Sequence, residues 1–98
     1  MSFSNLAALR GFSAQLEDEV HDNTVRSIQH FLTYGDAAPF KRGAKLFRSL
    51  GLDCKSIYET AISRIPAVQY QHIQALSKHS RAFGIALHAA ITGRSVIP

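Results

Sequence analysis

The chain has 98 residues, of which 46% are hydrophobic and 18% are charged, and its net charge is +4. The hydrophobic fraction is too high and the net charge too small for an intrinsically disordered chain. The length accommodates one hydrophobic core but not two, so we expect a single helical domain over residues 1–98.

Export and membrane insertion are not encoded by any recognisable pattern. Cys54 is the single cysteine, so no internal disulfide can form and a reducing compartment is the simpler expectation. An acidic run at residues 17–19 comes before any long apolar stretch could act as a secretory signal. The longest nearly apolar stretch, Ala82–Ile91, has about half of the roughly 20 residues that a membrane-spanning helix needs. We therefore expect a cytoplasmic protein without membrane contact.

Charge is unevenly distributed along the chain. Residues 1–35 carry two basic and four acidic residues, a balance of −2, whereas residues 36–98 carry nine basic and three acidic residues, a balance of +6. Such an asymmetry either steers an anionic partner to the second part of the chain or lets the two parts attract each other, within one molecule or between copies.

The N-terminal third is helical in its pattern. Apolar residues recur three and four positions apart over residues 6–20, and Ser4 or Asn5 can cap the first turn. A second apolar run begins at Val25 and ends before Gly35, which suits the left-handed position after a helix end. The polar segment between the runs contains capping residues but neither glycine nor proline, so one helix and two helices are both compatible with it. The first run consists of Leu6, Leu9, Phe12, Leu16 and Val20.

The segment after Gly35 predicts a basic amphipathic helix. Asp36 can cap it, and Pro39 fits its first turn, where the missing N–H has no cost. On a helix over residues 40–50 the apolar side chains share one broad side, with three basic side chains opposite. The apolar set is Phe40, Ala44, Leu46, Phe47 and Leu50, and the basic set is Lys41, Lys45 and Arg48.

A third helix follows a glycine turn. Gly51 ends the basic helix, and Asp53 can cap the next one. Pro66 cannot continue this third helix but can begin another, so it marks a sharp junction. The expected buried stripe of the third helix is Ile57, Ala61 and Ile65, with Ile62 beside it.

From Ala67 the apolar spacing predicts one helix of about 25 residues that ends at Gly93, the longest of the chain. Its second half is apolar on nearly every side and rich in small residues, which allow another helix to approach closely. No alternating run of strand length occurs. The expected fold is therefore an all-α, compact bundle of four or five helices with a long C-terminal helix. The small residues are Ala82, Gly84, Ala86, Ala89, Ala90 and Gly93.

The turn between the second and third predicted helices carries a recognisable pattern. Leu50 precedes the glycine of the turn, Leu52 follows it, Asp53 supplies a polar cap, and β-branched Ile57 lies further along. Over Gly43–Thr60 this pattern resembles the helix-turn-helix of DNA-binding regulators, in which two short helices cross over a tight turn and the second presents its polar side to the major groove.

The resemblance implies a DNA-binding regulator that uses residues 43–64. Two positions depart from the family pattern, because Phe47 stands where a small residue is usual and Thr60 where an aliphatic one is usual. In the helix-turn-helix reading the third helix would face the groove with Lys55, Ser56, Glu59 and Ser63, and the basic helix would face phosphates with Lys41, Arg42, Lys45 and Arg48.

Catalytic and metal-binding patterns are weak. No two of the five histidines stand three or four residues apart, which excludes a histidine cluster on one helix. Asp18, His21 and Asp22 share a helical face that Glu17 can join, and we interpret it as a solvated polar face. Cys54 has no assignable histidine base, and no glycine-rich phosphate loop is present. We expect no enzyme, no metal and no cofactor.

Two classes of function follow from these patterns. The favoured one is a non-enzymatic small helical interaction protein, such as an adaptor, inhibitor or regulatory subunit, that docks a protein partner or a second copy of itself as a homodimer. Its expected partner-binding surface lies on the last helix, at Phe83, Ala86, Leu87 and Ala90. The alternative is the helix-turn-helix regulator with DNA as its partner.

Overall fold

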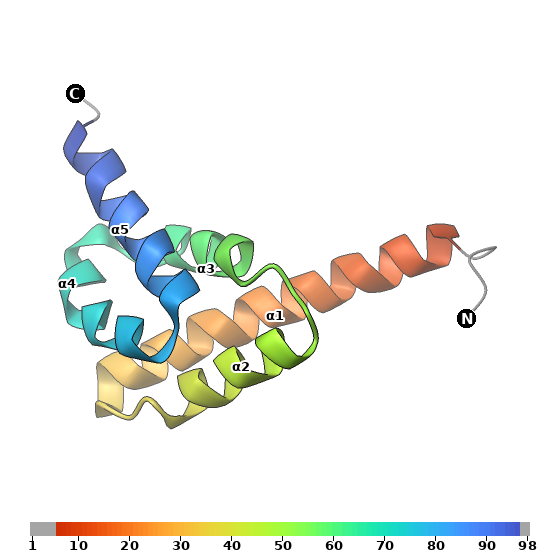
Figure 1. Ribbon diagram of the computed structural model, residues 1–98, viewed down its shortest axis with the longest axis horizontal. Coiled ribbons are helices and arrows are strands. Elements are labelled where there is room, and N and C mark those ends of the chain that lie inside the picture. Colours follow the sequence, from red (N-terminus) through yellow and green to blue (C-terminus); the bar gives the residue numbers. More distant parts are fainter. Residues whose placement is uncertain (1–5, 97–98) are drawn as a thin grey trace.

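Helices account for nearly all of the chain that the structure describes (Figure 1). A computed structural model describes the backbone of residues 6–96 and the side chains of residues 16–93. The described part holds five α-helices and two short 3-10 helices, with no strand, so the prediction of an all-α bundle is confirmed. The elements are α1 (Leu6–Tyr34), α2 (Ala38–Ser49), α3 (Cys54–Ser63), η2 (Ala67–Gln69), α4 (Tyr70–Ile73), η3 (Gln74–His79) and α5 (Arg81–Val96).

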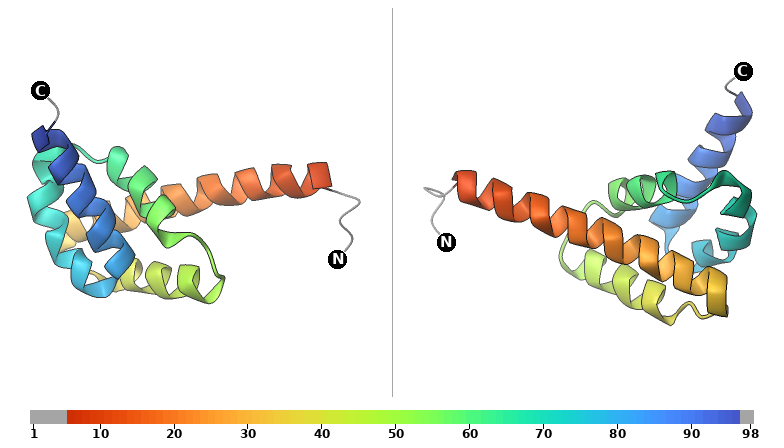
Figure 2. Two further views of the ribbon diagram at one scale, coloured as in Figure 1. Left: turned by 45° about the horizontal axis from the view of Figure 1, so that its top comes forward. Right: turned by 180° about the vertical axis from the view of Figure 1, so that it is seen from behind.

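The second half of α1 forms one side of the bundle. Helices α2 and α3 pack against it, and α5 crosses α3 on the side away from α1 (Figure 1). The first half of α1 extends away from the other helices, as two further views show (Figure 2). The described chain measures 46 × 35 × 19 Å along its principal axes.

Helix α1 is continuous, which answers the question that its polar middle segment left open. The hydroxyl of Thr24 donates to the carbonyl of Val20 at 2.7 Å, and that of Ser27 donates to the carbonyl of Thr24 at 2.8 Å. Both hydroxyls are thus used inside the helix and do not cap a break. Gly35 ends α1 with a φ of +69°, as predicted. The suggested caps Ser4 and Asn5 lie outside the described residues.

The predicted cap of α3 is present, whereas the N-cap position of α2 is Ala37 and the predicted cap, Asp36, lies one residue before it. Asp36 accepts a hydrogen bond from the backbone N–H of Ala38 at 3.0 Å, and this bond lowers the pKa of Asp36, followed by a bond from His30. Asp53 caps α3 by accepting from the N–H of Ser56 at 3.2 Å. Gly51 takes a φ of +69° in the turn between the two helices.

The buried side of α2 is narrower than predicted. Phe40, Ala44 and Phe47 are buried, but Leu46 and Leu50, which were predicted on the same broad side, are 53% and 57% exposed. A helix at the edge of a small bundle buries only the stripe of side chains that faces its neighbours. Apolar residues at the margin of that stripe remain exposed to solvent. The predicted stripe of α3, by contrast, is entirely buried.

Aromatic rings from three helices form the centre of the core. Phe40 of α2 lies 5.0 Å from Phe83 of α5 and 5.5 Å from Tyr58 of α3, measured between ring centroids. Tyr58 and Phe83 are 5.4 Å apart, edge to face. Such pairs contribute about 0.5–1.5 kcal/mol each beyond the burial of their area. We call Phe40, Tyr58 and Phe83 the aromatic cluster.

The prediction of one long helix after Pro66 was wrong. Residues 67–79 form the short helices η2, α4 and η3, and Ser80 is extended with φ −157° and ψ 118°. The hydroxyl of Ser80 then accepts from the N–H of Phe83 at 3.2 Å and so caps α5. Ile73 and Leu76 precede this break, and Phe83 follows it, and all three are buried. The change of direction lets both segments reach one core, and it leaves α1, with 29 residues, as the longest helix.

Two helical glycines should respond differently to alanine. Glycine to alanine in a helix interior ordinarily stabilises by up to about 1 kcal/mol. A Cβ at Gly43 would lie 3.6 Å from the Phe47 ring, an ordinary contact, whereas one at Gly84 would lie 3.3 Å from the Cβ of Ser77. We expect Gly43→Ala to raise the free energy of unfolding by up to about 1 kcal/mol, and Gly84→Ala to gain less or to lose stability. Urea unfolding of the two variants measures the difference, and equal gains would contradict the close approach of η3 to α5.

The hydroxyl of Tyr58 gives a second prediction. Tyr58 is 1% exposed, and its phenolic oxygen has no hydrogen-bond partner of normal geometry. Burial raises the pKa of Tyr58 to about 12, and the nearby Ser80 side chain opposes only part of that shift. Below pH 10 the phenol is protonated in both the folded and unfolded states. Between about pH 10 and 12 only the unfolded state loses the proton, so folding stability falls, by at most about 3 kcal/mol.

The variant Tyr58→Phe isolates this effect. At pH 7 we expect it to be as stable as the wild type or more stable, because it removes an unpaired buried hydroxyl. Its advantage over the wild type should grow as the pH rises above 10, since groups shared by both proteins cancel in the comparison. Chemical denaturation at pH 7, 9 and 11 checks both points. A loss of more than about 1 kcal/mol at pH 7 would show that the hydroxyl is hydrogen-bonded.

Candidate functional site

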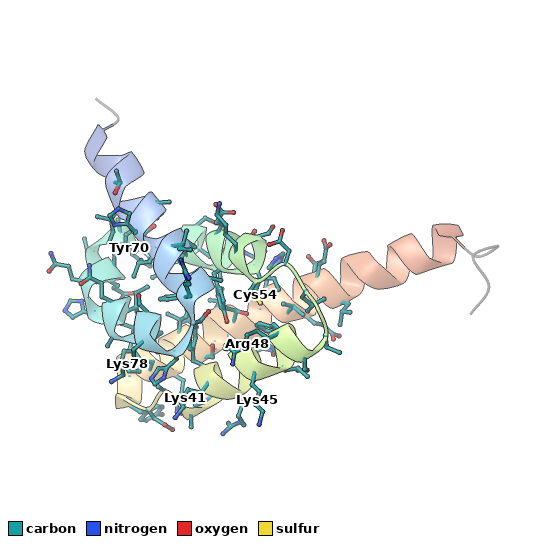
Figure 3. The ribbon with its side chains drawn as sticks, viewed as in Figure 1. Lys41, Lys45, Arg48, Cys54, Tyr70 and Lys78 are labelled. Atoms are coloured by element: carbon teal, nitrogen blue, oxygen red, sulfur yellow. The ribbon has the colours of Figure 1, made fainter. Side chains whose placement is uncertain are left out.

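Basic side chains from two separate parts of the chain gather on one face of the bundle. Lys41, Lys45 and Arg48 follow one another along α2, and Lys78 lies at one end of this row (Figure 3). Together with His79 and Arg42, the three α2 residues line a shallow hollow. Lys78 shares a second shallow hollow with Arg81 at the start of α5. We call this surface the basic face: Lys41, Arg42, Lys45, Arg48, Lys78, His79 and Arg81.

His79 shows how close the two parts of the basic face lie. Its pKa is lowered first by desolvation and then by the positive charges of Lys41 and Lys78. His79 therefore lies near both lysines, and it lines the same hollow as Lys41. At neutral pH the positive charge of the face therefore comes from its lysines and arginines.

No carboxylate forms an ion pair with the basic face within the described residues. The two ion pairs found there are elsewhere, between His30 and Asp36 at 3.1 Å and between Arg64 and Asp22 at 3.0 Å. Asp36 feels the charge of Arg42 at longer range, which contributes slightly to its lowered pKa. Six permanent positive charges thus stand together without a paired counter-charge, a surface that attracts anions.

Local structure explains how these residues meet. The α2 residues are four and three positions apart, which places them on one side of the helix. The break at Ser80 turns the chain after η3, and it brings Lys78 and His79 beside α2. The residues contributed by η3 and α5 were missed in the sequence because a continuous helix was expected there. One sequence feature could have indicated the break. In the run Ser77–Arg81, basic residues lie on both sides of Ser80, a serine that can cap a helix.

The residues that the helix-turn-helix resemblance assigns to base contacts lie elsewhere. Lys55, Ser56, Glu59 and Ser63 are exposed on α3, as predicted. Ser56, however, shares a hollow with Glu17 and His21 of α1, and Glu59 and Ser63 line a groove against α5. Neither hollow contains a residue of the basic face. A helix-turn-helix protein contacts bases and phosphates with one continuous surface. Here the hollows that contain the α3 residues share no residue with the basic face.

The partner-binding surface predicted on the last helix is largely buried within this chain. Phe83, Ala86 and Leu87 are buried inside this chain, where α5 packs on α3 and η3. Ala86 and Ala90 nevertheless line the groove between α3 and α5. Ala90 is partly buried and Ala89 is exposed. The apolar character of this helix is used mainly by the core, because the bundle is small and α5 crosses its middle.

Other candidate chemistry has no assembled site in the described part of the chain. No three histidine, cysteine or carboxylate side chains come together there in a way that could hold a metal ion. Asp22, from the polar face noted in the sequence, pairs with Arg64 instead. Cys54 is a free, partly buried thiol. None of the described helices combines the length and apolar character needed to cross a membrane.

Comparison with protein-family models, with curated proteins and with solved structures finds no match to this chain. What the chain does is therefore inferred from the geometry and charge of its own surface.

Proposed function

We propose that the chain is a non-enzymatic binding protein whose basic face holds the phosphate backbone of duplex nucleic acid. The observation that carries this proposal is the convergence of seven basic side chains, from α2 and from residues 78–81, without a carboxylate paired to any of them. A surface that only needed to be soluble would intersperse both signs of charge.

The dimensions of the face suit a polyanion. From Lys41 to Arg48 the helix rises about 10 Å, and about 10 Å of duplex axis carries roughly six phosphate charges. A single small anion would use two or three cations and leave the others unneutralised. A phosphate backbone can engage the α2 row and the residues of η3 and α5 at the same time.

The basic face is suited to binding the phosphate backbone of a nucleic acid rather than its bases. Stacking on bases needs exposed aromatic rings, and the rings beneath α2, Phe40, Phe47 and Tyr58, are buried. Tyr34 is 72% exposed, but it lies at the end of α1 with its ring against His30. Within the described residues the basic face thus offers charge and no stacking platform, which favours a duplex and a sequence-independent mode of binding.

The proposal predicts weak, salt-dependent binding. For mixed-sequence duplex DNA at physiological salt we expect a dissociation constant of roughly 10 μM or higher, within the non-specific range. Each of Lys41→Ala, Lys45→Ala, Arg48→Ala and Lys78→Ala should lower the slope of log affinity against log salt by about one. Fluorescence anisotropy over a salt series measures this slope.

Matched controls separate this proposal from its competitors. Each alanine variant should change the free energy of unfolding by no more than about 0.5 kcal/mol, because the residues are exposed. Lys55→Ala removes the same charge from α3 and should leave the slope unchanged. Sub-micromolar binding to a preferred site, lost on replacing Lys55 or Glu59, would instead establish the helix-turn-helix reading, and an unchanged slope in all four variants would refute the proposal.

Docking of a protein partner or of a second copy is a second candidate, favoured by the first half of α1. This part of the helix extends beyond the bundle (Figures 1 and 2), and Leu16 at its base is 38% exposed. The sequence places Leu6, Leu9 and Phe12 at helical spacing with it, although their side chains lie outside the described part. Light scattering tests self-association. A monomer at high micromolar concentration would contradict the docking of a second copy.

A further inference from the structure

A pocket lies between α1 and α2 and shares only Arg42 with the basic face. It has a volume of about 360 Å³, and it is lined by α1 between Asn23 and His30, by α2 between Pro39 and Phe47, and by Tyr58 of α3. Pockets that bind small molecules span roughly 300–1,000 Å³. We call it the α1–α2 pocket.

Short side chains on both helices leave this space open. Thr24 and Ser27 face it from α1, and Gly43 faces it from α2. A Cβ built on Gly43 would meet only the Phe47 ring, at 3.6 Å, an ordinary contact, so there is room for a Cβ on the α2 wall. The floor is apolar, because it consists of the buried rings of Phe40, Phe47 and Tyr58.

The rim of the pocket is basic. Arg26 lines it from α1 and Arg42 from α2, and no aspartate or glutamate of the described chain lines it. The guanidinium of Arg26 donates to the side-chain oxygen of Asn23, a neutral partner that leaves its charge uncompensated. His30 lines the pocket as well and is held at its end by Asp36, at 3.1 Å. An aromatic floor beneath two arginines from facing walls fits a ligand with one apolar and one anionic end.

We propose that the α1–α2 pocket binds a small aromatic carboxylate. Its ring lies on the floor of Phe40, Phe47 and Tyr58, and its carboxylate lies between Arg26 and Arg42. Arginine suits this role because its planar guanidinium donates two parallel hydrogen bonds to a carboxylate. The pocket shares Arg42 with the basic face of the proposed function, whereas Arg26 and Gly43 line the pocket and are not part of that face.

The experiment uses naphthoate as the probe and naphthylmethanol as its neutral counterpart of similar shape. Each is titrated into the full chain by isothermal calorimetry and by NMR chemical-shift mapping. We expect naphthoate to bind with shifts at Ser27 and Gly43, and naphthylmethanol to bind at least several-fold more weakly. Arg26→Gln should weaken naphthoate about threefold to fivefold, the effect of one exposed cation.

Two pairs of variants distinguish a pocket from general attraction. Lys45→Gln removes one charge from the neighbouring basic face and should leave naphthoate affinity unchanged. Gly43→Leu should fill the pocket and abolish binding, whereas Gly43→Ala should keep most of the affinity. If Gly43→Leu fails to fold, Ser27→Leu fills the pocket from the facing wall.

Three results would overturn the proposal: no naphthoate binding at millimolar concentration, equal affinity for the neutral probe, or the same loss in Lys45→Gln as in Arg26→Gln. Binding of DNA is measured on the same variants, and it should be unchanged in Gly43→Leu. The failure of one proposal is thus separable from the failure of the other.

Discussion

The aromatic cluster is the contact on which the rest of this structure depends. Phe40, Tyr58 and Phe83 come from α2, α3 and α5, and each ring lies within 5.5 Å of the other two, measured between centroids. Turning Phe40 inward fixes the rotation of α2 about its axis, since side chains on a helix are separated by about 100°. Lys41, next in sequence, is thereby directed to the surface. The packing that forms the core therefore also determines which way the basic side chains of α2 point.

The break at Ser80 is the second condition for the basic face. If residues 67–93 formed one straight helix, as their spacing suggested, the segments before and after Ser80 would lie along a single axis of about 40 Å, and a small core could not bury both. The extended conformation of Ser80 costs helical hydrogen bonds, and its hydroxyl restores one of them at the N–H of Phe83. Burial of Ile73, Leu76 and Phe83 on the same core offsets the rest. The gathering of Lys78 with Lys41 is a consequence of this packing.

The sequence was informative where structure is decided locally. Gly35, Gly51 and Asp53 were predicted because a left-handed turn or a helix cap depends on a few neighbouring residues. The α2 row was predicted for the same reason, from helical spacing. The exposure of Leu46 and Leu50 and the bend at Ser80 were not, because both depend on which distant helices share the core. The predicted site accordingly contained the half of the basic face that lies on one helix and missed the half that tertiary structure adds.

The charge asymmetry of the sequence survives folding largely uncancelled. Four of its seven acidic residues lie on α1, a single helix about 43 Å long, and none of these four forms an ion pair with α2. Of these four, only Asp22 forms an ion pair, and its partner Arg64 is not part of the basic face. Exposed pairs of this kind contribute little to stability, about 0–1 kcal/mol, so folding gains little from bringing opposite charges together. The separation of charge therefore follows from the length and rigidity of α1. The molecule therefore has acidic residues on α1 and a separate basic face, which an approaching polyanion meets in a preferred orientation.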